Sequence, residues 1–418
     1  MALELAGGPV EGLIDPASVG FSAPRLSRLT AALNDLVEGG RVPGLVALVA
    51  RHGRLAYFES FGRRDLEAGD PMPRNAIFRL YSMTKPITAT AVMMLYEEGQ
   101  FQLDDSISRF IPEFAATRVF DGATEPAKDD AGVPDGWLPT LPLDRPITIR
   151  HLLTHTSGIT YGDFAGGPTE QLSARERIQR RDEPLGEKIA RLAGLPLAHQ
   201  PGAAWTYGLS IDVLGRLIEI VAGQPFDVFL RRRLFDPLGM VDTGFAVPAD
   251  SRGRLAAAYS PRRDGTLERL RMQDTLYAQP PAYLSGGAGL VGTALDYARF
   301  AQMLANGGTL AGVRLLSPKT VSLFAASQTP RPSLPIFPTG WPFREGYGMA
   351  LGVRTLVDVA RSGMLGSVGS FTWQGAASTD FWVDPVEGIV GVLMLQLLPG
   401  YFRPGELMRV LTYQALVD

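Results

Sequence analysis

Apolar residues follow two different spacings in the first part of this chain. Leucines three and four residues apart predict a helix from Pro24 to Glu38. Two strand-like runs follow, Leu45–Arg51 and Leu55–Phe61, and the His52-Gly53 pair between them suits the turn of a β-hairpin. We therefore expect one helix and one hairpin before residue 62.

The last third of the chain returns to strand-like patterns, whereas the middle is largely helical. A helix is expected from Ser210 to Val221 in the middle, and an amphipathic one from Glu406 to Leu416. The strands expected in the last third are Tyr347–Val353, Phe371–Ala376, Thr379–Val383 and Ile389–Gln396.

This order of elements favours a core to which both ends of the chain contribute. We expect an α+β fold in which residues 1–81 and 285–418 form a sheet domain. A mostly helical region, residues 82–284, is inserted between them.

Composition narrows the classes of function. The chain has 418 residues, 45% of them hydrophobic and 20% charged, and its net charge of −3 gives no electrostatic reason to expect nucleic acid or an anionic membrane as partner. The absence of cysteine excludes thiol catalysis. No apolar run reaches the about 18 residues of a membrane span, and the first 20 residues lack the pattern of a signal peptide, so a cytoplasmic location is expected.

A serine and a lysine lie three residues apart where an apolar helix is expected to begin. Pro86 is tolerated in a first turn, which predicts a helix that starts near Ser82, and Gly99 predicts its end. Residues three apart share a helix face, so the Lys85 amine can reach the Ser82 hydroxyl. The N-terminal end of a helix also favours a developing negative charge. The pattern indicates a Ser-Lys nucleophile.

Three other patterns favour structural interpretations. His151 and His155, on a helix expected from Ile149 to Ile159, have metal-ligand spacing, but Leu152 replaces the Glu of a zinc protease and no third ligand is near. The G-x-G-x-x-G from Gly287 to Gly292 follows no apolar strand and lacks the ribose-binding acid, so its glycines are expected to permit a tight turn. The arginines from 175 to 181 are expected to form a solvated helix face.

Three stretches occur in an order that one enzyme superfamily shares. They are Ser82-Met83-Thr84-Lys85, Tyr207-Gly208-Leu209 and Trp373-Gln374-Gly375, supported by LLTHTSG (152–158), DVLGRLIEIVAG (212–223) and FWVDP (381–385). In these residues the chain resembles the serine β-lactamase and penicillin-binding-protein superfamily, and within it the class C-like family VIII carboxylesterases. The resemblance covers roughly residues 20 to 415 and implies a β-lactamase-like fold, with the Ser-x-x-Lys helix between the sheet domain and the helical region.

The resemblance also implies roles for the matching residues. Ser82 would be the acylated nucleophile, Lys85 would take its proton, and Tyr207 would shuttle a proton to the leaving group. Which of Lys85 and Tyr207 is the acylation base stays open, since free Lys and Tyr titrate at about 10.4 and about 10. The backbone N–H groups of Ser82 and Ala376 would form the oxyanion hole. Residues expected to contact the substrate are Tyr81, Leu209, Trp373, Gln374 and Gly375.

Two departures from the superfamily pattern bear on the substrate. Penicillin-active relatives usually carry Asn at the position of Leu209, and Lys-Thr-Gly or a close variant at Trp373-Gln374-Gly375. Loss of that amide and that cation weakens recognition of an anionic β-lactam, whereas a more apolar site suits a neutral ester. Gln374 also departs from the small residue usual in the esterase version of the triplet.

We therefore expect a serine carboxylesterase that cleaves small or short-chain esters through an acyl-enzyme, with no metal and no cofactor. One alternative is an acyltransferase of the same fold, in which an alcohol replaces water. Another is weak β-lactamase or D-aminopeptidase-like activity. A non-catalytic, penicillin-recognising binding protein is the alternative from another class, against which the ordered set of Ser82, Lys85 and Tyr207 argues. The physiological ester and the oligomeric state stay open.

Overall fold

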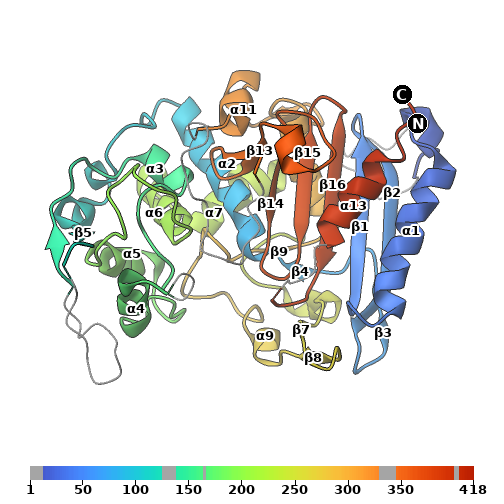
Figure 1. Cartoon of the computed structure of the whole chain (residues 1–418), viewed down its shortest axis with the longest axis horizontal. Coiled ribbons are helices and arrows are strands. Elements are labelled where there is room, and N and C mark those ends of the chain that lie inside the picture. Colours follow the sequence, from blue (N-terminus) through green and yellow to red (C-terminus); the bar gives the residue numbers. More distant parts are fainter. Residues whose placement is uncertain (1–12, 125–137, 163–165, 329–344, 400–403) are drawn as a thin grey trace.

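A large antiparallel sheet forms the centre of the fold, and its strands come from the N-terminal and the C-terminal parts of the chain (Figure 1). The computed structural model describes residues 13–124, 138–162, 166–328, 345–399 and 404–418. The sheet has eight strands in the order β12-β13-β14-β15-β16-β1-β2-β3, and its neighbours pair antiparallel. The strands are β1 (Gly44–Arg51), β2 (Arg54–Asp65), β3 (Asp70–Pro71), β12 (Tyr347–Met349), β13 (Arg354–Leu356), β14 (Phe371–Gln374), β15 (Asp380–Asp384) and β16 (Ile389–Leu395). The expected α+β fold is confirmed.

The predicted hairpin is formed by β1 and β2. His52 (φ 51°) and Gly53 (φ 75°) both have left-handed backbones, which is the geometry of a type I′ turn. All eight residues of β1 are buried, because this strand lies in the middle of the sheet with both faces covered.

Helices cover both faces of the sheet. On one face, Leu45, Ala47 and Val49 of β1 pack against α1 (Ala23–Glu38) and α13 (Pro404–Tyr413). On the other face, the alternate residues Val46, Leu48 and Ala50 belong to the main core. There α10 (Ala294–Ala305) contacts β1, β15 and β16. Figure 1 shows α1 and α13 side by side next to the sheet. Helix α2 lies between the sheet and the helices α3, α5 and α6.

The rest of the described chain is mostly helical, and four of its helices pack against α6. The remaining helices are α2 (Thr84–Glu97), α3 (Ile149–Leu153), α4 (Pro168–Arg175), α5 (Leu185–Ala193), α6 (Ser210–Ala222), α7 (Phe226–Leu230), α8 (Asp236–Leu238), α9 (Met272–Thr275), α11 (Pro318–Ala325) and α12 (Val359–Ser362). Four two-stranded ladders pair β4 (Phe78–Arg79) with β9 (Val291–Gly292), β5 (Val119–Phe120) with β6 (Thr140–Leu141), β7 (Tyr259–Pro261) with β8 (Leu267–Arg269), and β10 (Thr309–Leu310) with β11 (Val313–Arg314). Helix α6 contacts α2, α3, α5 and α7. The division at residues 81/82 and 284/285 stays a prediction.

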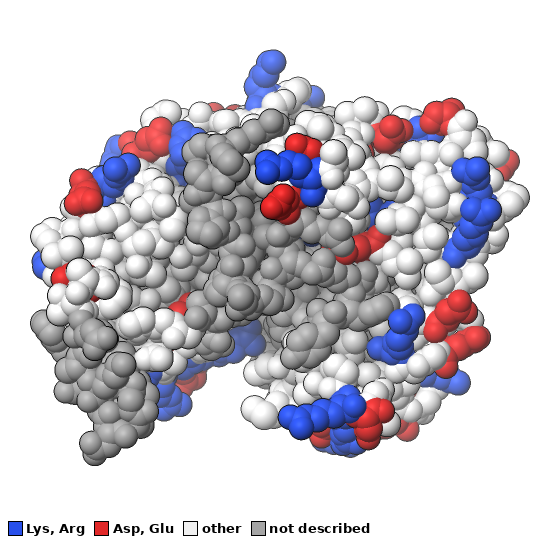
Figure 2. All heavy atoms as spheres, in the orientation of Figure 1, with Lys and Arg blue, Asp and Glu red and all other residues white. Residues whose placement is uncertain are grey.

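Two features of the described residues bear on possible partners. None of their helices has the length and apolar character needed to cross a membrane. On the face seen in Figure 2, basic and acidic side chains lie next to one another, and no broad patch of one sign is visible.

The helix predicted from Ile149 to Ile159 is wrong beyond Leu153, where α3 ends. His155 has a left-handed backbone (φ 55°), and the Thr156 N–H bonds back to the His151 carbonyl at 2.9 Å. These are the marks of a Schellman ending, which usually uses glycine at the left-handed position. Because a histidine occupies it here, the sequence carried no stop signal.

Other predicted boundaries also changed. The arginine tract 175–181 is exposed but is not a helix face, because α4 ends at Arg175 and Arg177 has a left-handed backbone (φ 52°). The strand expected from Tyr347 to Val353 ends at Met349, since Gly352 (φ 83°) turns the chain into β13, which the sequence did not predict. Strand β14 ends at Gln374 instead of Ala376.

Candidate active site

Helix α2 begins where the sequence predicted, directly after a single 3-10 turn formed by residues 81–83. Pro86 is its third residue, where no intrahelical N–H bond is lost. Gly99 (φ 76°) follows its end, as expected. Every residue from Thr84 to Leu95 is buried, so α2 is enclosed on all sides along these three turns.

The residue before the nucleophile candidate has an unusual backbone. Tyr81 has φ 45°, in the left-handed region that aromatic residues rarely occupy, and such outliers cluster at functional sites. Its hydroxyl donates to Gln273 Oε1 at 3.0 Å, and burial raises the pKa of Tyr81 above its usual range. This turn holds Ser82, which is 8% exposed, at the N-terminal end of α2.

Two donors converge on the Ser82 hydroxyl. Lys85 Nζ donates to Ser82 Oγ at 3.1 Å, as the three-residue spacing predicted. Tyr207, from the loop before α6, donates its hydroxyl to the same oxygen at 2.7 Å. The Lys85 nitrogen also lies 4.5 Å from the centroid of the Tyr207 ring. Residues 125 positions apart therefore meet at one oxygen atom.

A second tyrosine, Tyr161, belongs to the same cluster and was missed in the sequence. Its hydroxyl accepts from Lys85 Nζ at 2.8 Å, and its ring lies 5.3 Å from that of Tyr207. Burial, and then the neighbouring Tyr207, raise the pKa of Tyr161 well above its usual range. The available signal was its position three residues after the LLTHTSG phrase.

Aromatic rings pack around Tyr207. His155, which is fully buried, lies 4.9 Å from Tyr207 and stacks parallel to Trp373 at 6.3 Å. Burial and the nearby Lys85 charge hold the pKa of His155 well below its usual range. His155 is therefore neutral at physiological pH, and uncharged aromatic rings surround Tyr207.

His151 has the structural role that the sequence predicted. Its Nδ1 accepts from the Thr148 N–H at 3.2 Å, while Thr148 Oγ1 accepts from the His151 N–H, so the pair caps α3. Among the residues that the structure describes, no group of three His, Asp or Glu side chains is arranged to hold a metal ion.

The two N–H groups expected to form an oxyanion hole lie on neighbouring segments. The turn after β14 packs closely on the residue before Tyr81, because a Cβ on Gly375 would lie 2.5 Å from the Leu80 carbonyl oxygen. Within the described ranges, neither the Ser82 N–H nor the Ala376 N–H donates a hydrogen bond to the protein. Both donors are thus available to a ligand, and their role stays a prediction.

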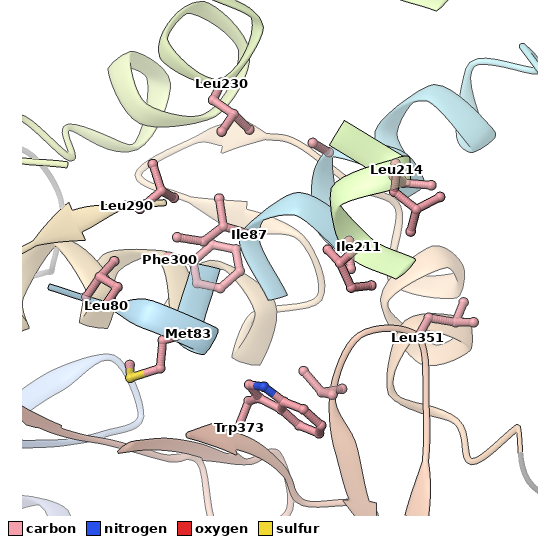
Figure 3. Close-up of a cluster of buried hydrophobic side chains, with 14 of the residues drawn as sticks. Leu80, Met83, Ile87, Ile211, Leu214, Leu230, Leu290, Phe300, Leu351 and Trp373 are labelled. Atoms are coloured by element: carbon pink, nitrogen blue, oxygen red, sulfur yellow. The ribbon is translucent and has the colours of Figure 1, made fainter. Parts of the chain in front are cut away.

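The residues expected to contact the substrate differ in their surroundings. Leu209 is buried and immediately precedes α6, so it places an apolar side chain two residues from Tyr207. Trp373 points from β14 toward the segments that carry Met83 and Ile211 (Figure 3). Gln374 donates an amide N–H to Asp380 Oδ2 at 2.8 Å, so this donor is engaged within the protein.

Comparisons with known proteins agree on one family. A family model described as Beta-lactamase matches residues 29–412. The chain is 35% identical to Esterase EstB of Burkholderia gladioli, over 91% of this chain and 93% of that protein. It is 36% identical to Protein Rv1367c of Mycobacterium tuberculosis, over 88% of this chain and 89% of that protein. Among solved structures, EstCE1, a hydrolase with promiscuous acyltransferase activity, superposes with a TM-score of 0.75 at 28% identity, covering 93% of this chain and 99% of that one.

Proposed function

The chain belongs to the β-lactamase family, and from this premise we propose that Ser82, Lys85 and Tyr207 are the catalytic residues of a serine carboxylesterase. The fold is β-lactamase-like, and the similarity to EstB and EstCE1 supports ester hydrolysis of the family VIII type on a small-molecule substrate. The observation that carries the residue assignment is the convergence of Lys85 Nζ and the Tyr207 hydroxyl on Ser82 Oγ.

In the acylation step, Ser82 Oγ attacks the ester carbonyl carbon and its proton passes to the Lys85–Tyr207 pair. Lys85 Nζ has three oxygen neighbours, Ser82 Oγ, Tyr161 Oη and the Gly287 carbonyl, which match the three N–H donors of an ammonium. An ammonium beside a phenol favours the phenolate electrostatically. We therefore assign Tyr207 as the group that takes the Ser82 proton, with Lys85 as the cation that stabilises the deprotonated phenol.

The negative charge that develops on the carbonyl oxygen meets two backbone donors, the N–H groups of Ser82 and Ala376. The N-terminal end of α2 adds a favourable dipole at the same place. Tyr207 then returns its proton to the leaving alcohol, which departs and leaves the acyl group on Ser82 Oγ.

Deacylation repeats these steps with water as the nucleophile. A second candidate function is acyl transfer, in which an alcohol attacks the acyl-enzyme in place of water, and the similarity to EstCE1 favours it. Both reactions share the acylation step, so they differ only in the acceptor that reaches Ser82.

The surroundings of Ser82 favour neutral esters over β-lactams. Leu209 and Trp373 present apolar groups, and the amide donor of Gln374 is bonded to Asp380. A missing hydrogen bond to a charged group costs about 1.5–3 kcal/mol, so two poor contacts lower kcat/KM for an anionic β-lactam by a few orders of magnitude.

The test is a panel of p-nitrophenyl esters of increasing acyl length, run beside a chromogenic cephalosporin and repeated with an added alcohol. We expect short esters to be cleaved readily, and Ser82→Ala to lose nearly all of this activity. Cephalosporin turnover equal to that of the best ester in kcat/KM would contradict the esterase assignment. The cytoplasmic location expected from the sequence is a separate proposal, which cell fractionation tests.

A further inference from the structure

The glycine-rich motif at residues 287–292 lies against the catalytic helix. Its loop makes three hydrogen bonds to the first two turns of α2. Thr88 Oγ1 donates to the Gly286 carbonyl at 2.7 Å, Lys85 Nζ donates to the Gly287 carbonyl at 2.8 Å, and the Leu290 N–H donates to Thr84 Oγ1 at 3.2 Å. The position of the Gly287 carbonyl therefore helps to set the position of the Lys85 ammonium.

A buried carboxylate from another element holds this loop in place. Asp212, in the first turn of α6, is fully buried. Its Oδ1 accepts the Ser285 hydroxyl at 2.6 Å, the Gly287 N–H at 3.2 Å and the Tyr283 hydroxyl. The N-terminal end of α6 favours the negative charge of this side chain.

Only glycine fits at position 287 while Asp212 is present. A Cβ on Gly287 would lie 2.5 Å from Asp212 Oδ2, closer than carbon and oxygen approach in proteins. Gly287 thus donates its N–H to Asp212 and accepts from Lys85 at its carbonyl, so a single residue links the Asp212 carboxylate to the Lys85 ammonium.

The Asp212 charge also acts on this site, because burial and then Tyr207 and Asp212 raise the pKa of Tyr161, which bonds Lys85. Within the described residues, no carboxylate lies within salt-bridge distance of Lys85. A second buried cation, Lys188 of α5, lies 3.8 Å from the centroid of the Tyr283 ring. Burial lowers the pKa of Lys188 to about 8, and the Asp212 charge acts in the opposite direction. The titratable or charged groups that face Asp212 or Lys85 from the packed elements are His155, Tyr161, Arg181, Lys188, Tyr207 and Tyr283.

We propose that Asp212 is a positioning residue for the reaction, which acts through Gly287 to hold the Lys85 ammonium against Ser82 and supplies the negative charge that this cation needs. The inference rests on the proposed function, because it concerns the same lysine. It assigns a purpose to the glycine motif other than nucleotide binding.

The first experiment separates charge from shape. Asp212→Asn keeps an oxygen acceptor for Tyr283, Ser285 and Gly287 but removes the charge. Asp384→Asn is the matched control, because Asp384 is also fully buried and accepts a tyrosine hydroxyl and backbone N–H groups, on the α13 side of the sheet. The measurement is kcat and KM for a p-nitrophenyl ester as a function of pH. The value of kcat is expressed per mole of active enzyme, counted as the Ser82 that a fluorophosphonate labels.

The negative charge of Asp212 favours the protonated form of the Lys85–Tyr207 pair. Because the pair must lose a proton before it can accept one from Ser82, removing that charge makes this loss easier. We expect Asp212→Asn to shift the ascending limb of the kcat/KM profile to lower pH by about one unit, with little change in KM. We expect Asp212→Ala to lower kcat by about 100-fold, because Lys85 loses its fixed carbonyl partner. An Asp212→Asn profile that overlays those of wild type and Asp384→Asn would overturn the proposal, since a merely structural role would leave the profile in place.

A second experiment needs no enzyme activity. Gly287→Ala should lower Tm in the wild type, because its methyl group meets Asp212, but not in the Asp212→Ala background, where space is available. Additive losses in the double variant would show that the two residues do not act as a unit and would overturn the proposal. Failure of the proposed function gives a different result, a wild type that neither cleaves esters nor labels at Ser82.

Discussion

Replacing Tyr207 by phenylalanine removes one hydroxyl group and leaves its surroundings intact. The ring stays packed against four aromatic neighbours, at 4.9 Å from His155, 5.3 Å from Tyr161, 5.7 Å from Trp205 and 6.0 Å from Trp373. The substitution removes the 2.7 Å hydrogen bond to Ser82 Oγ. The substitution therefore separates the chemistry of Tyr207 from its packing.

The two effects should differ greatly in size. Loss of one hydrogen bond lowers the free energy of unfolding by about 1 kcal/mol, which changes Tm by no more than about 4 °C. Loss of the group that carries the proton lowers kcat by about 10²- to 10⁴-fold. Because the ring still shapes the pocket, KM should change little.

The assay is steady-state hydrolysis of a short p-nitrophenyl ester, with Tm measured on the same samples. Tyr161→Phe is the matched control, since Tyr161 is a partly buried tyrosine of the same cluster whose hydroxyl bonds Lys85. We expect its kcat to fall at least tenfold less than that of Tyr207→Phe. A Tyr207→Phe enzyme that keeps more than a tenth of wild-type kcat would refute the assignment of Tyr207 as the proton carrier.

Three further predictions concern other parts of the structure. Gly375→Ala would place its methyl group 2.5 Å from the Leu80 carbonyl oxygen and displace the Ala376 N–H, so kcat should fall at least about tenfold; unchanged kcat per labelled Ser82 would contradict the oxyanion role. Leu209→Asn supplies the amide that β-lactam-active relatives carry, so the ratio of cephalosporin to ester kcat/KM should rise about tenfold, and a constant ratio would argue against Leu209 as a specificity residue. Burial raises the pKa of Asp296 to about 6, so the folded state favours its protonated form; this stabilisation is present below about pH 4 and is lost as pH rises through 6, about 3 kcal/mol in all. Asp296→Asn should therefore remove that part of the pH dependence of urea unfolding, and a variant with the wild-type slope would disprove the effect.

The contact between Ser82 and Lys85 was predictable because it is local. A first-turn proline and a three-residue spacing were sufficient to place the two side chains on one face of one helix. Tyr207 is different, since no local pattern relates it to Ser82. Its assignment depended on the order of three motifs along the chain.

Other features depended on tertiary structure and could not be predicted. Tyr161 and Asp212 reach the site through packing between α2, α6 and two loops, and a single sequence carries no record of that packing. The early end of α3 at Leu153 was hidden because His155 occupies a left-handed position that usually belongs to glycine. The tight packing at Gly287 was expected only in general terms, because the group that it accommodates, the Asp212 carboxylate, lies 75 residues away in the sequence.

The central claim is that Ser82 forms a covalent acyl-enzyme with a carboxylic ester. The direct measurement is mass spectrometry of the protein quenched with acid during turnover of a p-nitrophenyl ester, followed by peptide mapping. We predict an added mass equal to the acyl group on the peptide that contains Ser82, increased in amount when deacylation is slow and absent in Ser82→Ala. An acyl group mapped to another residue, or ester cleavage that persists in Ser82→Ala, would contradict the account.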